Sequence, residues 1–269
     1  MSEIDYFGNK DYRTIWSCFR NWGTYSKSCE AARMLLKISS RDENFTIANH
    51  ILQYADVFAG FEGSEKQAWA PVPGLEGILS AISEEVDSIV MCRTDPVKVK
   101  RGRLISWLGS ACYKPMSSSI SVSKKVKEEM LPLILSHEYT HHVEFSSPNA
   151  AIFDDLPVLT EGLADAVGIA ATKSYAARQN DEKLLAEVEK HILKRVTNAI
   201  DLIRTFEMGF GGPYSQKSFK RNIRYIDFYS IGCTAFLVAE ARHGQAIYRD
   251  IFRAENPLDM LVGLLGGTK

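Results

Sequence analysis

Apolar residues recur at intervals of three and four over most of the chain, and this spacing predicts a mainly helical protein. The run 181–204 shows the pattern at greatest length, because Leu184, Val188, Ile192 and Val196 follow one another every four residues. On this criterion we predict helices over residues 11–22, 28–38, 44–58, 75–83, 131–145, 158–175, 181–204, 227–242, 245–252 and 257–265.

The pattern changes in the middle of the chain, where short apolar stretches alternate with turn residues. Residues 86–93, 103–113 and 118–123 are rich in β-branched and aromatic side chains and are predicted to be strands. The basic run 98–103 is predicted to be a solvated hairpin tip rather than a nucleic-acid patch, because no aromatic residue interrupts it. Helices with a few strands between them indicate an α+β protein.

Two stretches rich in glycine and proline, 60–75 and 207–219, break the helical pattern. A chain of 269 residues can bury one large core, so we predict a single domain over 1–269. Within it we distinguish a helical part at 1–74, a part with sheet and metal-binding helices at 75–204, and a second helical part at 205–269.

The sequence H-E-x-x-H occurs inside the buried-looking stretch LPLILSHEYTHHVEF, as His137, Glu138 and His141. Residues four apart lie on one face of a helix, so the two imidazoles can point at one place. Glu138 lies about 100° further round the helix, where its carboxylate can act as a base beside a water that the metal activates. This is the pattern that a hydrolytic zinc site requires.

A zinc ion held by two histidines needs a third protein ligand. The acids that follow His141 are Glu144, Asp154, Asp155, Glu161 and Asp165. Glu144 lies on the same helix and would have to fold back, and the two aspartates at 154 and 155 are expected to cap the next helix. Glu161 and Asp165 are four apart on that helix, so one can bind metal while the other accepts a proton from a ligand histidine.

The pattern H-E-x-x-H followed by E-G-L-A-D resembles the gluzincins, a branch of zinc peptidases, and the form HEYTHH…TEGLAD is most similar to the YjaZ-type predicted zinc-dependent proteases. The resemblance covers about residues 117–170. It implies one zinc ion held by His137, His141 and Glu161, with Glu138 as general base and Asp165 behind the first histidine. It also implies a zincin-like core in which a small antiparallel or mixed sheet packs on the motif helix, flanked by N-terminal and C-terminal helices.

Two further site predictions depend on the same resemblance. An edge strand at 117–122 would bind the substrate backbone through Ser119, Ile120 and Ser121, although a solvated serine-rich edge fits equally well. The stretch Y-S-I-G from Tyr229 resembles the one that supplies a tyrosine to the reaction centre, where a phenol can stabilise an oxyanion. Tyr225 and His243 are alternatives for that role, and His191 is expected to be exposed or on the rim.

Charge and composition provide evidence on binding partners, on the role of the cysteines and on the location of the protein. The net charge is −1, so no global field attracts nucleic acid or an anionic membrane. Five cysteines without a C-x-x-C pair indicate neither a disulfide framework nor a cysteine zinc site. Residues 1–20 carry charges and no apolar run, so we expect no signal peptide and a cytoplasmic location.

The sequence therefore predicts a zinc-dependent metallopeptidase whose partner is a peptide or protein substrate. Two alternatives remain at this stage. The protein could be a catalytically inactive zincin-like metal-binding or scaffold protein, although a purely structural zinc site has no use for Glu138. It could also hydrolyse amides other than peptides. Substrate, cleavage position and oligomeric state are not encoded in any motif that we recognise.

Overall fold

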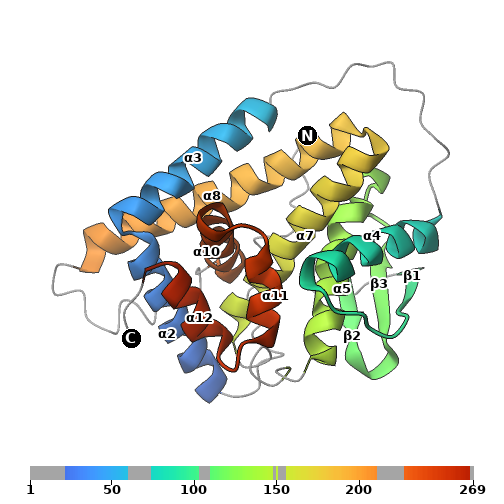
Figure 1. Ribbon diagram of the computed structural model, residues 1–269, viewed down its shortest axis with the longest axis horizontal. Helices are drawn as coiled ribbons and strands as arrows, with labels where there is room; N and C mark the ends of the chain where they lie inside the picture. The colour runs from blue at the N-terminus through green and yellow to red at the C-terminus, as the bar shows by residue number, and fades with distance from the viewer. Residues whose placement is uncertain are drawn as a thin grey trace.

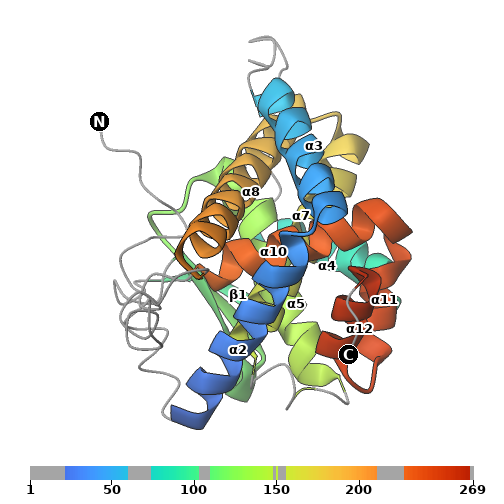
Figure 2. The same cartoon turned by 90° about the vertical axis from the view of Figure 1, so that its left-hand side faces the viewer.

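The computed structural model describes residues 22–59, 74–102, 110–147, 150, 156–210 and 227–266. Within these residues, helices make up most of the fold, and a small sheet lies at one side against helix α5 (Figures 1 and 2). The helices are α2 (Trp22–Ser39), α3 (Asp42–Ala59), α4 (Leu75–Val90), α5 (Leu131–Ser146), α7 (Pro157–Gln179), α8 (Glu182–Phe210), α10 (Phe228–His243), α11 (Ala246–Arg253) and α12 (Pro257–Leu264). The strands are β1 (Lys98–Gly102), β2 (Ala111–Lys114) and β3 (Ser119–Ser123), with 3-10 turns at Pro115–Ser117 and Glu128–Met130.

The predicted fold class is confirmed, since the structure is a mainly helical α+β protein with a small mixed sheet on the motif helix. The strand order is β1-β3-β2, with β1 parallel and β2 antiparallel to β3. Because β3 is paired on both sides, the prediction that 117–122 forms an edge is wrong. The basic run that we expected at a hairpin tip forms β1 instead, and it occupies one side of β3.

Helix α4 overturns another strand prediction. It continues to Val90, so residues 86–90 of the predicted strand 86–93 are helical. Ile78, Ile82, Val86 and Val90 are all buried. Their spacing of four places them on one helix face, and burial of that face outweighs the strand preference of β-branched residues. Of the predicted strand 103–113, residues 103–109 lie outside the described part, and residues 111–113 belong to β2.

Helix α7 is the centre of the molecule and separates α5 from α10 (Figure 1). It begins at Pro157, a residue compatible with the first turn of a helix, and its side chains are buried along most of its length. An ideal Cβ at Gly168 would lie 3.2 Å from the backbone nitrogen of His137. Helix α5 therefore packs directly on the backbone of α7.

The contact between α7 and α10 is closer still. At Gly162 an added Cβ would lie 2.4 Å from the Cα of Gly232, and at Gly232 it would lie 2.0 Å from the carbonyl oxygen of Val158. These two glycines thus bring the two helix backbones into direct contact. Because Gly162 follows Glu161 and Gly232 lies one turn from Tyr229, this contact sets the distance between two predicted site residues.

The remaining helices surround this centre. Helix α3 lies alongside α8 in both views, and α11 and α12 pack near α4, α2 and α10 (Figures 1 and 2). Among the described residues, no helix combines the length and apolar character needed to span a lipid bilayer. Of the predicted helix at 11–22, only Trp22 is described, and it begins α2. Of the predicted loop at 207–219, residues 207–210 belong to α8, so that part of the prediction is wrong, and the remainder lies outside the described residues. The division of the chain into three parts stays a prediction.

Candidate metal centre

Helix α5 holds the H-E-x-x-H motif in the interior. Pro132 lies in its first turn, and the side chains from Leu131 to Thr140 are buried. His137 and Glu138 are 5% and 9% exposed, so both polar groups have left water and need partners within the protein. His141, one turn further on, keeps 13% of its side-chain surface exposed. The motif is therefore mostly buried, and its second histidine keeps part of its surface in contact with solvent.

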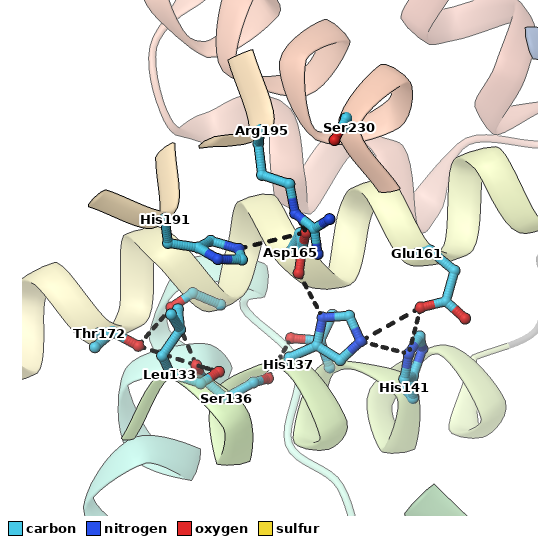
Figure 3. Close-up of polar contacts among 12 residues, drawn as sticks. Leu133, Ser136, His137, His141, Glu161, Asp165, Thr172, His191, Arg195 and Ser230 are labelled. Atoms are coloured by element: carbon cyan, nitrogen blue, oxygen red, sulfur yellow. Dashed lines mark hydrogen bonds and ion pairs between the residues drawn. The ribbon is translucent and has the colours of Figure 1, made fainter. Parts of the chain in front are cut away.

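Helix α7 brings Glu161 to the two histidines (Figure 3). Glu161 Oε2 lies 3.3 Å from His137 Nε2 and 3.4 Å from His141 Nε2, and the two Nε2 atoms are 3.1 Å apart. The donor atoms of these three residues form a group that could hold a metal ion. This arrangement is consistent with the geometry of an HExxH…E motif, and the prediction that the three side chains meet is confirmed.

The other nitrogen of each imidazole is also held by an acid. His137 Nδ1 lies 2.9 Å from Asp165 Oδ1, and His141 Nδ1 lies 2.7 Å from Glu144 Oε2. Since both carboxylates accept, each Nδ1 donates its proton, which leaves a lone pair on each Nε2 of the neutral rings. Two such lone pairs and a carboxylate oxygen then converge at one place, an arrangement that requires a cation or added protons.

The pKa values reflect this convergence. Burial by itself lowers the pKa of His137, but hydrogen bonds to Asp165 and Glu161 outweigh burial and raise it to about 9. Burial likewise opposes the charged form of His141, yet Glu144 and Glu161 raise its pKa well above the ordinary value. In turn the two histidines lower the pKa of Glu161, against the effect of its burial. Protons on these side chains would therefore compete with a divalent ion for the same place.

Glu138 faces the sheet as well as the histidines. Its Oε2 accepts a hydrogen bond of 2.6 Å from the backbone nitrogen of Tyr113 in β2. Burial raises the pKa of Glu138, while His137 and His141 lower it. A buried carboxylate with a raised pKa is a better proton acceptor than an exposed one. Tyr113 is itself fixed, because its hydroxyl lies 2.8 Å from His142 Nδ1.

Tyr229, in the first turn of α10, reaches the same centre. Its ring lies 6.0 Å from the ring of His137 at an interplanar angle of 20°. Burial and the charges of Glu161 and Asp165 raise the pKa of the phenol well above its usual value. The group is therefore neutral near pH 7 and can donate a hydrogen bond.

Helix α8 contributes two buried residues that the sequence did not reveal. Arg195 Nε lies 2.6 Å from Asp165 Oδ2, and His191 Nε2 lies 3.5 Å from the same oxygen (Figure 3). His191 is 6% exposed, so the prediction of an exposed or rim residue is wrong. The apolar stripe of this helix consists of positions 184, 188, 192 and 196. His191 and Arg195 lie next to this stripe, and this position in the sequence could have indicated that they are buried.

Other predicted site residues stand apart from the centre or outside the described chain. His243 binds the carbonyl oxygen of Leu264 and is exposed, so it does not face the two histidines. Tyr225, Asp154 and Asp155 lie outside the described residues. Ser119, Ile120 and Ser121 are buried in the central strand, and their role in substrate binding stays a prediction that has lost its premise of a free edge.

Comparisons of the chain with models of known protein families, with curated proteins and with solved structures found no match. The geometry of the site supports a group of two histidines and one glutamate able to hold a metal ion.

Proposed function

We propose that the protein is a zinc-dependent metallopeptidase of the gluzincin type, with one zinc ion held by His137, His141 and Glu161. The observation that carries this proposal is the separation of 3.1–3.4 Å among the three donor atoms. In a tetrahedral zinc site with bonds of about 2.0–2.1 Å, neighbouring donors lie about 3.3–3.4 Å apart. Three protein ligands of this kind leave one position open, as catalytic zinc sites do.

The acids behind the histidines support the same assignment. Asp165 and Glu144 accept from the two Nδ1 atoms, which orients each ring and makes its other nitrogen a better ligand. Glu144 was an alternative third ligand in the sequence. Since it faces the Nδ1 side of His141, away from Glu161, we assign it to this supporting role.

Zinc, when bound, would supply a Lewis acid and lower the pKa of a coordinated water to about 7. The chain's own contribution to the reaction is the movement and placement of protons. Glu138 would accept the proton of the attacking water and pass it to the leaving amine. Tyr229 would donate a hydrogen bond to the carbonyl oxygen as that oxygen gains charge. Tyr229 is suited to this role because its raised pKa keeps the phenol protonated.

The hydrogen bond between Glu138 and β2 indicates where a substrate would lie. Ser110 accepts from Ser123 on the β3 side, whereas the nitrogen of Tyr113 points to Glu138. In an antiparallel pair these directions alternate, so Ala111 and Tyr113 turn their backbone groups away from β3. An extended peptide added along this side of β2 would pass next to Glu138. We therefore propose β2, in place of the central strand, as the backbone-binding strand.

The first test is the metal content of the full-length purified protein and its cleavage of a peptide library with and without a chelator. We expect about one zinc per chain and chelator-sensitive cleavage. Protein that holds zinc but cleaves no peptide would support the inactive metal-binding alternative. Protein with no affinity for zinc would refute both readings.

The ligand set is tested by Glu161→Ala, with Glu84→Ala as a matched control on an exposed surface of α4. Loss of one of three ligands should weaken zinc binding by at least about 10- to 100-fold, because even supporting residues around a metal contribute that much. The control should bind zinc as the unchanged protein does. Equal zinc affinity in both variants would exclude Glu161 as a ligand.

A further inference from the structure

Arg195 is a fully buried cation that has no direct role in the proposed reaction. Its side chain is 2% exposed, and it lies between α7 and α10. Burying a guanidinium group costs several kcal/mol unless anions and aromatic rings compensate it. The groups that provide this compensation therefore indicate what Arg195 does.

On one side Arg195 is paired with Asp165, with 2.6 Å between Nε and Oδ2. The other oxygen of Asp165 accepts from His137 Nδ1 at 2.9 Å. One carboxylate thus joins the metal-binding histidine of α5 to the arginine of α8. Figure 3 shows this row of side chains running from α8 across α7 to α5.

On the other side Arg195 meets the N-terminus of α10. Its Cζ lies 4.9 Å from the centre of the Tyr229 ring, and its Nη1 lies 3.8 Å from Asp227 Oδ1. Asp227 is the N-cap of α10 and accepts from the backbone nitrogen and the hydroxyl of Ser230 at 3.0 and 2.5 Å. Arg195 therefore contacts both the side chain of Tyr229 and the residue that fixes the start of its helix.

We infer that Arg195 is a positioning residue that holds the Tyr229 ring against His137, through an ion pair with Asp165 on one side and with Asp227 on the other. This inference rests on the proposed function, because the position of Tyr229 matters to a reaction only if its phenol takes part in one. Two features of the arrangement favour positioning over simple core packing. The guanidinium lies against the ring face, and both of its acidic partners belong to elements that carry site residues.

The first experiment measures the position of the ring and requires no metal. In tyrosine- and histidine-labelled full-length protein, the nuclear Overhauser effect between the ring protons of Tyr229 and His137 reports their contact. Tyr229→Phe identifies the signal. We expect Arg195→Lys to weaken this effect at least twofold, since lysine keeps the charge but loses the planar group. Arg204→Lys, the same change on the exposed side of α8, should leave it unchanged. An unchanged effect in Arg195→Lys would overturn the inference.

The second experiment asks whether this position serves the reaction. In zinc-loaded protein we expect Arg195→Lys to lower kcat by about 2- to 30-fold, the range that a cation–π contact supports, with KM and zinc affinity unchanged. In the Tyr229→Phe background the same change should lower kcat less than about twofold, because the group that Arg195 positions has gone. Equal losses in both backgrounds would show that Arg195 only holds the core together, and would overturn the inference.

Two safeguards separate the possible failures. Should Arg195→Lys fail to fold, Asp227→Asn enters both experiments in its place, because asparagine still caps α10 but no longer attracts the guanidinium. Should zinc-loaded protein cleave no peptide, the proposed function fails, whereas the metal-free measurement still decides whether Arg195 positions the ring.

Discussion

Replacing Gly232 by alanine tests the close approach of α7 and α10. The added Cβ would lie 2.0 Å from the carbonyl oxygen of Val158 and 2.7 Å from the Cα of Gly162. Favourable separations between carbon atoms are about 3.5–4.0 Å, so α7 and α10 would have to move apart by roughly 1 Å. Both obstacles are backbone atoms, which cannot swing aside as a side chain can.

The expected loss of stability follows from two opposing effects. Overpacking typically costs about 1–3 kcal/mol, and contact with backbone places this site at the upper end. The better helix propensity of alanine offsets about 1 kcal/mol of this cost. The net loss in the free energy of unfolding is about 2 kcal/mol, which lowers the Tm of a chain of this size by about 4–8 °C.

Thermal unfolding of the metal-free protein, followed by circular dichroism, measures this change. Gly263→Ala in α12 is the matched control, because an added Cβ there meets no atom within 4 Å. The control should gain up to about 1 kcal/mol from helix propensity. The two variants should therefore shift the Tm in opposite directions. A Gly232→Ala protein that melts at or above the temperature of the unchanged protein would refute the backbone contact.

Three further predictions concern the site and the chain end. Glu138→Gln should keep bound zinc and lose about 10²- to 10⁴-fold in kcat, because glutamine cannot accept the proton; cleavage at the unchanged rate would exclude this residue as the base. Zinc binding at pH 7 should release at least one proton, and zinc affinity should rise as the pH increases to 9, because the pKa of His137 is about 9, that of His141 is also well above its ordinary value, and zinc binds the neutral rings. Titration calorimetry in two buffers of different ionisation enthalpy measures this release, and heats independent of the buffer would contradict it. Asn44→Ala should cost about 2 kcal/mol in unfolding free energy, because the buried amide donates to the carbonyls of Ile38 and Leu265. Asn49→Ala is its control, since among the described residues the Asn49 side chain bonds only to Phe45 of its own helix; equal losses in urea unfolding would count against the role of Asn44.

The candidate metal-binding group was predictable because its signals are local. The spacing of four between His137 and His141 fixes their common face, and the same spacing relates Glu161 to Asp165. Only the meeting of the two helices required information beyond one segment, and the resemblance to gluzincins supplied it. The predicted start of the second helix, at residue 158, lies one residue from the observed start at Pro157.

The strand order of the sheet and the ion pair of Arg195 could not be predicted from local signals of this kind. A stretch such as 86–90 fits a strand by residue type and a helix by spacing, and the burial that decides between them comes from distant segments. Strand order depends on pairing between β1 and β3, whose partners lie 21 positions apart, as for Lys98 and Ser119. The ion pair of Arg195 with Asp165 joins two helices, and nothing in the sequence near either residue indicates it.

Because β2 is short, main-chain hydrogen bonds with this strand alone could give only a low affinity for a peptide. Only Ala111 and Tyr113 direct backbone groups away from β3, and the amide of Tyr113 already serves Glu138. About three main-chain hydrogen bonds are then within reach of an added strand. With so few main-chain hydrogen bonds, discrimination among peptides would depend on side-chain pockets or on contacts outside this strand. Lengthening a peptide beyond the strand would increase its affinity little.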